Sequence, residues 1–401
     1  MSFLSQVLLG NSLGLEDFGR FSSTYAKATI ISGVLTLGLD ISALKFASAY
    51  FQSGRAKEFN RFVAYSVCLV GLVSITFFCL WLVAPRIGLG RIGAFSPSVA
   101  IAILFWTMTR LIVSLIRATG QQVLSLVSDR IIRDGVLAIA CIAAYIGFEN
   151  VISLPIAIKA LAFGCGLGLL VSSLIFAFGN RPVAMNDVGI AESRAVWVST
   201  SLSLWAANIF ELAFARTEVI FLAFYGQAAN AGLFAILMAV SNLLVLPVLA
   251  LNVVFQPRFA GLNGAENRDR LRQEARRYVL AGLPVTLVIG MIVLINPAFF
   301  LNLFGAHKIG SDDVWYLVAL VALRMILAPF GARAPLLQMN DGHFTLAVII
   351  LIGLSFKIML LAIPNAMQSI VWVITVSIAT TLFVQLMIFF SSQQLLNNPK
   401  K

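Results

Sequence analysis

Charged residues are scarce in this chain: of its 401 residues only 11% are Asp, Glu, Lys or Arg, whereas 60% are hydrophobic. An ordinary soluble domain has about 25% charged and about 45–50% apolar residues, so this composition excludes that class. The apolar residues form continuous runs of about 20 residues, which is the length of a membrane-spanning helix. They do not alternate as the strands of a membrane β-barrel do. The sequence therefore predicts an all-α integral membrane protein.

Residues that bind metals and nucleotides are also rare. The two histidines, His307 and His343, are far apart, and the four cysteines lie in apolar runs without a C-x-x-C pair. We therefore expect no metal site. The chain lacks the G-x-x-x-x-G-K-[ST] motif of nucleotide hydrolysis, and we expect no cofactor. Its net charge of +11 is explained by basic cytoplasmic loops, and we expect no nucleic-acid partner.

The apolar runs predict eleven full spans that follow a short N-terminal stretch, Met1–Gly10, and a loop over Asn11–Arg20. These spans are expected at 21–50, 62–84, 97–118, 122–147, 152–178, 195–224, 229–255, 275–301, 313–336, 343–363 and 367–391. Most loop arginines and lysines fall on one alternating set of loops, with only Arg20, Arg86, Arg91 and Lys308 on the other set. The positive-inside rule places the richer set and the C-terminus in the cytoplasm.

Glycines and charged residues indicate an internal repeat at an offset of 213 residues. Gly19 matches Gly232, Arg55 matches Arg268, and Arg110 falls one place from Arg324. An offset of six helices predicts two parallel six-helix lobes around a central cavity. We expect an N-terminal lobe at 1–180, a cytoplasmic linker at 181–194 and a C-terminal lobe at 195–401. By this repeat most of the first helix is missing from the chain, as expected of a truncated chain or a misassigned start. The alternative is a surface-lying stub in a protein of eleven spans.

Basic residues outnumber acids inside the predicted spans. The basic residues there are Lys27, Lys45, Arg110, Arg130, Arg133, Lys159, Arg216, Arg324 and Lys357, and the acids are Asp40, Asp129, Asp134, Glu211 and Glu218. A charge facing lipid costs at least about 2.5–3.5 kcal/mol, so these groups are expected to line a watery cavity, to pair, or to reach the interface. A surplus of cations around one cavity would attract anions.

Several of these residues have two interpretations. Arg110 and Arg324 lie near mid-span at equivalent places, which favours lining of a cavity. The run Asp129–Asp134 also fits a paired helix face, with bridges from Asp129 to Arg133 and from Arg130 to Asp134. Arg216 lies between Glu211 and Glu218, so a local salt bridge is the alternative to substrate binding. Lys159 and Lys357 have no acid within four residues.

The acids are candidates for ion coupling. We predict this role for Asp40, Glu211 and Glu218, because a carboxylate in a low-dielectric site takes up a proton more readily than one in water.

Short motifs give the chain a family resemblance. The segment Leu13–Phe21 (L-G-x-x-x-F-G-R-F), Arg216-Thr-Glu218, the turn Gly226–Phe234 and Pro257 before a basic loop resemble bacterial oligosaccharide flippases, the polysaccharide branch of the MATE-like exporter superfamily. The resemblance implies movement of undecaprenyl-diphosphate-linked oligosaccharide across the bacterial cytoplasmic membrane by alternating access.

The resemblance also implies residue roles and partners. Cavity cations meet the diphosphate in that family, and the matching positions are Arg110, Arg216 and Arg324, followed by Arg133, Lys357 and Lys159. Guanidinium groups suit this role because they bind phosphate oxygens bidentately. Expected partners are the lipid-linked substrate, the bilayer, a glycan polymerase and other export machinery.

Other functions fit the composition less well. A MATE-like small-molecule antiporter would use an acidic, aromatic cavity, and a lipid II flippase would have further helices. A membrane polymerase or ligase would require acid–base groups on an outer loop, where only His307, Asp312 and Asp313 are available. We therefore expect a transporter and no enzyme.

Overall fold

The structure is a computed structural model that describes residues 3–84, 96–147, 152–179, 194–261, 268–305, 310–339, 342–363 and 369–397. All regular structure in these ranges is helical, which confirms the predicted all-α class. Two compact units divide the chain: unit 1 comprises residues 1–13 and 24–212, and unit 2 comprises residues 14–23 and 213–401. The predicted linker at 181–194 lies, except for its last residue, outside the described residues, and the predicted lobe boundaries stay predictions.

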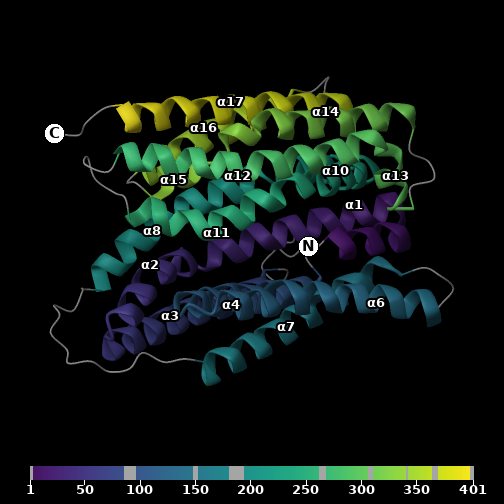
Figure 1. The fold of residues 1–401 in the computed structure, drawn as a ribbon. Helices are drawn as coiled ribbons and strands as arrows, with labels where there is room; N and C mark the ends of the chain where they lie inside the picture. The colour runs from purple at the N-terminus through teal and green to yellow at the C-terminus, as the bar shows by residue number, and fades with distance from the viewer. Residues whose placement is uncertain are drawn as a thin grey trace. The chain divides into compact units, whose positions relative to one another are not determined.

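Unit 1 contains most of the N-terminal helices. They are α1 (Phe3–Leu35, of which residues 14–23 belong to unit 2), α2 (Leu39–Gln52), α3 (Ala56–Val83), α4 (Pro97–Ala118), α5 (Gln122–Leu126), the π-helix η1 (Val127–Ile132), α6 (Arg133–Gly147), α7 (Leu154–Phe178) and α8 (Arg194–Phe214) as far as Leu212. Helix α4 lies between α3 and α7 and contacts both (Figure 1).

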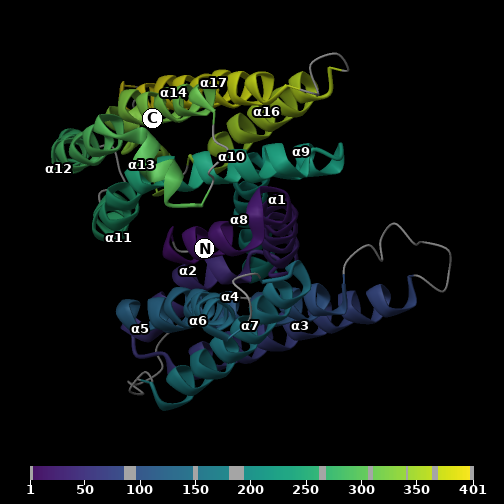
Figure 2. The same ribbon diagram turned by 90° about the vertical axis from the view of Figure 1, so that its right-hand side faces the viewer.

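Unit 2 contains the remaining helices. They are α9 (Thr217–Phe224), α10 (Ala228–Ser241), the 3-10 turn η2 (Asn242–Val245), α11 (Leu246–Gly261), α12 (Arg268–Ile295), α13 (Pro297–Asn302), α14 (Ser311–Leu327), the 3-10 turn η4 (Ala328–Phe330), α15 (Arg333–Met339), α16 (His343–Leu361) and α17 (Ile370–Asn397). Helices α16 and α17 run side by side in both ribbon views (Figure 2).

Fewer helices qualify as membrane spans than the eleven predicted. Among the described residues, eight helices are long and apolar enough to cross a membrane, and the bent pair α1–α2 makes a ninth. The two predicted spans without such a helix are 122–147 and 195–224. The first is divided by the π-helix at its charged segment, and the second is broken after Phe214. Clustered charges interrupt both, and the hydropathy of a window does not show where a backbone breaks.

The predicted loop at Asn11–Arg20 is wrong, because these residues belong to α1. Only Gly14 departs from helical geometry, with φ of 73° and ψ of 170°. Gly226, which the repeat places within one residue of Gly14, also has a positive φ of 77°. A positive φ is readily available only to glycine, so both positions have a backbone conformation that a side chain would strain.

Gly19 and Gly232, which are matched by the repeat, face each other within unit 2. A Cβ atom on Gly19 would lie 1.8 Å from the carbonyl oxygen of Ala228, and one on Gly232 would lie 2.0 Å from that of Leu15. The absence of side chains therefore allows α1 and α10 to approach backbone to backbone. The two glycines that the predicted repeat aligns thus lie at one contact between helices within unit 2.

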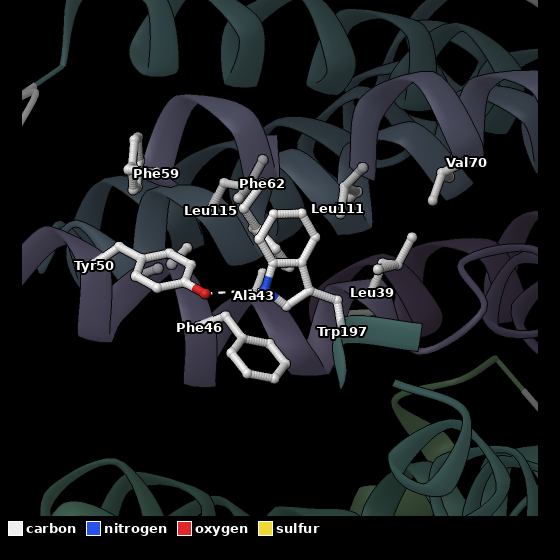
Figure 3. Packing of buried hydrophobic residues seen from close by; sticks show 12 residues of the cluster. Leu39, Ala43, Phe46, Tyr50, Phe59, Phe62, Val70, Leu111, Leu115 and Trp197 are labelled. Carbon is white, nitrogen blue, oxygen red and sulfur yellow. Dashed lines mark hydrogen bonds between the residues drawn. The ribbon is translucent and has the colours of Figure 1, made fainter. Parts of the chain in front are cut away.

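An aromatic cluster forms part of the core of unit 1 (Figure 3). Trp197 on α8 is 1% exposed, and its Nε1 donates a 2.9 Å hydrogen bond to the hydroxyl of Tyr50 on α2. Phe62 on α3 meets the same indole edge to face, with ring centroids 5.2 Å apart. This cluster joins α8 to α2 and α3 within unit 1.

Candidate functional site

Arg110 and Asp40 form an ion pair within unit 1. Arg110 lies on α4, and its Nε and Nη2 donate to Oδ2 of Asp40 at 3.3 and 3.2 Å. The other carboxylate oxygen accepts from the hydroxyl of Thr36 and the backbone N–H of Ile41, both at 3.0 Å. Asp40 lies in the first turn of α2, directly after the bend at 36–38 that separates α1 from α2. Four donors therefore hold this carboxylate beside a helix break.

A second buried pair lies where the π-helix ends. Nε of Arg133 donates to Oδ1 of Asp134 at 3.2 Å, and both side chains are at most 8% exposed. The guanidinium stacks over the ring of Trp106, 4.6 Å from its centroid, and Trp106 contacts Tyr25. Oδ2 of Asp134 is buried and accepts no hydrogen bond from the described residues. The bridge expected between Asp129 and Arg133 cannot be followed, since the side chains of 128–130 lie outside the described residues.

A third pair bridges the break between α8 and α9 in unit 2. Lys357 on α16 is 2% exposed, and its Nζ donates to Oε1 of Glu218 at 2.7 Å and to the carbonyl oxygen of Phe214 at 2.9 Å. Phe214 ends α8 and Glu218 lies in the first turn of α9. The ammonium also lies 3.5 Å from the centroid of the Phe214 ring. Lys357 thus satisfies a carbonyl that the break would leave without a partner.

Arg324 has a neutral partner. It lies on α14 inside a candidate span, and its Nη2 donates to Oδ1 of Asn242 at 3.4 Å. No ion pair joins Arg324 to an acid in the described part of the chain. Asn242 opens the 3-10 turn between α10 and α11. Arg110 therefore meets a carboxylate beside the bend between α1 and α2, whereas Arg324 meets an amide in a 3-10 turn inside a candidate span.

The remaining candidates do not join these pairs by any described ion pair. Arg216 is the half-buried N-cap of α9, and Glu211 is exposed on α8. Lys159 is exposed on α7. The local bridge considered between Arg216 and Glu218 is replaced by the contact of Glu218 with Lys357. No cluster of three or more metal-ligating side chains occurs in the described segments.

Sequence reasoning identified the charged residues but not most of their partners. Asp40 is 70 residues from Arg110, and Glu218 is 139 residues from Lys357. A linear sequence does not say which helices are neighbours, so pairing across these separations was not visible in it. Asn242 and Trp106 carry no charge, so the search for charged residues in the spans did not single them out.

Comparisons with known proteins support the fold. Residues 203–332 match the MatE family model. No protein of curated function matches the sequence.

Solved structures are similar over nearly the whole chain. An inward-facing multidrug resistance MATE family transporter of the MOP superfamily has a TM-score of 0.72 at 12% identity, covering 98% of this chain and 93% of that one. An outward-facing structure has a TM-score of 0.66 at 12% identity, covering 98% and 90%. A MOP superfamily transporter from Pyrococcus furiosus, whose pocket is described as having reverse polarity, has a TM-score of 0.67 at 13% identity, covering 99% and 96%. The chain therefore has the fold of MATE transporters.

Proposed function

We propose that this protein is a membrane transporter, and no enzyme, that works by alternating access. Its fold is shared with transporters solved in both inward-facing and outward-facing conformations. The segment that matches the MatE model, residues 203–332, includes the helix break before Arg216 and the arginine at 324. We take both as support for a transporter with a polar substrate path.

The proposed substrate is an undecaprenyl-diphosphate-linked oligosaccharide that is moved between leaflets of a bacterial cytoplasmic membrane. The observation that supports an anionic substrate is the neutral partner of Arg324. A guanidinium inside a candidate span is costly unless an anion or several acceptors satisfy it. Asn242 supplies one long hydrogen bond of 3.4 Å. A diphosphate has oxygens that could accept two parallel hydrogen bonds from the guanidinium of Arg324.

The paired cations have a different role in this proposal. Arg110, Arg133 and Lys357 each contact a buried carboxylate, so their charge is already balanced. A substrate anion would have to displace Asp40, Asp134 or Glu218 from them. We assign these pairs to positioning the helix breaks, and keep Arg216 and Lys159 as further contacts along the substrate path.

The proposed setting follows from the same substrate. The C-terminus would be cytoplasmic, and a glycan polymerase and other export machinery would act on the translocated product.

A MATE-like small-molecule antiporter is the second candidate. The fold is equally that of multidrug resistance transporters.

The test is a translocation assay in vesicles reconstituted with the full chain and a lipid-diphosphate oligosaccharide. Arg324→Gln is expected to reduce the flipping rate by about 100-fold or more, since it removes a charged hydrogen-bonding partner worth about 3 kcal/mol. Arg324→Lys keeps the charge but lacks the planar guanidinium, so its flipping rate is expected to lie between those of Arg324→Gln and wild type.

Asn242→Ala is the matched control, because it removes the neutral partner and keeps the guanidinium. It should retain most of the flipping rate. If the Arg324→Gln variant is correctly inserted and flips the substrate at the wild-type rate, this site is excluded. If a cationic dye is exported and none of these substitutions changes its efflux, the antiporter is favoured.

A further inference from the structure

Helix α12 is longer than the hydrocarbon core of a bilayer is thick, and its first ten residues are the part that extends out of that core. At 1.5 Å per residue, Tyr278–Ile295 spans about 27 Å, close to the thickness of the hydrocarbon core. That segment has no charged residue, whereas residues 268–277 contain five arginines and two acids. The basic end therefore lies at the level of the lipid headgroups, in continuous helix with the span.

One face of this basic end is packed against the protein. Leu271, Ala275 and Tyr278 are buried in a cluster with Phe255 of α11 and Leu336 of α15. The Tyr278 hydroxyl also donates a 2.7 Å hydrogen bond to Asn252 on α11. These contacts fix the rotation of α12 about its axis, so the arginines on its opposite face occupy defined positions.

The opposite face presents a basic arc, which comprises Arg270, Arg272, Arg276 and Arg277, all exposed. Two of them have partners on the same helix: Arg272 lies 3.6 Å from Asp269, and Arg277 lies 2.6 Å from Glu274. Arg270 and Arg276 have no ion pair within the described residues. At 100° per residue the four side chains lie away from the buried face, toward lipid headgroups and water.

We propose that the basic arc binds anionic phospholipid headgroups of the surrounding leaflet, such as phosphatidylglycerol. The charge of the basic arc complements that of such lipids. The arc is expected at the same depth as their phosphates, and the packing of α12 fixes its orientation. Arginine forks match phosphate oxygens bidentately, and basic residues at a membrane boundary attract acidic lipids. The proposal is independent of what the protein transports, because it uses no residue of the candidate site.

Native mass spectrometry of the full chain in detergent tests the proposal. The protein is titrated with phosphatidylglycerol and, separately, with phosphatidylcholine. Wild type is expected to prefer phosphatidylglycerol, and the double variant Arg270→Gln/Arg276→Gln to lose about ten- to thirtyfold of that preference, given the usual attraction per basic residue. Arg270→Lys/Arg276→Lys should retain most of it.

Gln273→Ala is the matched control on the same exposed face and should change nothing. An unchanged preference in the Gln double variant would overturn the proposal. The proposal would also be overturned if inorganic pyrophosphate displaced more phosphatidylglycerol than chloride does at equal ionic strength. The basic arc would then be a diphosphate site rather than a lipid-binding surface.

Discussion

The bridge from Lys357 across the break between α8 and α9 gives the sharpest stability prediction. Lys357→Met replaces the ammonium with an apolar side chain of similar length. It leaves Glu218, which is 4% exposed, as an uncompensated buried charge, and leaves the carbonyl of Phe214 without its donor.

The magnitude follows from burial. Removing one partner of a buried ion pair destabilises a protein by about 3–5 kcal/mol, and loss of the carbonyl hydrogen bond and the contact with the Phe214 ring acts in the same direction. Glu218→Gln is expected to be milder than Lys357→Met, because its amide oxygen still accepts from Nζ. The loss of unfolding free energy in the double variant should be smaller than the sum of the losses in the two single variants by about 2–3 kcal/mol.

The assay is reversible unfolding of the purified protein in mixed micelles with an increasing fraction of denaturing detergent. Lys159→Met, an exposed lysine on α7, is the control and is expected to change stability by less than about 0.5 kcal/mol. If the stability loss of the double variant equals the sum of the losses in the two single variants, Lys357 and Glu218 do not interact and the bridge is refuted.

Two further predictions concern packing. Gly232→Ala should destabilise the protein by about 1–3 kcal/mol or more, because its Cβ would lie 2.0 Å from the carbonyl oxygen of Leu15; Gly135→Ala, where a Cβ meets nothing within 4 Å, should be neutral or stabilising in the same unfolding assay. Tyr50→Phe should lower stability by about 1 kcal/mol, since it removes the acceptor of the buried Trp197 indole, and an unchanged unfolding midpoint would show that this hydrogen bond contributes nothing.

Much of the fold was predictable from the sequence because lipid imposes one rule on every span. Apolar runs of sufficient length must be helices, so their existence followed from composition. The breaks did not follow. A hydropathy window averages over the bend at 36–38, the π-helix at Val127–Ile132 and the interruption after Phe214, so it could not locate them.

The charged residues of the candidate site could be singled out from the sequence, but their pairing could not. The repeat aligns Arg110 with Arg324 to within one place, and this equivalence stays a prediction; Arg110 reaches the bend between α1 and α2, whereas Arg324 reaches a 3-10 turn. The sequence could not show that one meets Asp40 and the other Asn242, since those partners are not equivalent positions in the repeat. This difference between the two copies is the basis for assigning substrate contact to Arg324 and positioning to Arg110.

The substrate class is tested most directly by measuring two fluxes in vesicles containing the wild-type protein. One is the transfer of a lipid-diphosphate oligosaccharide between leaflets, and the other is the efflux of a cationic dye driven by a proton or sodium gradient. The account predicts transfer of the oligosaccharide well above the rate in protein-free vesicles and no gradient-driven dye efflux. Dye efflux without oligosaccharide transfer would contradict it.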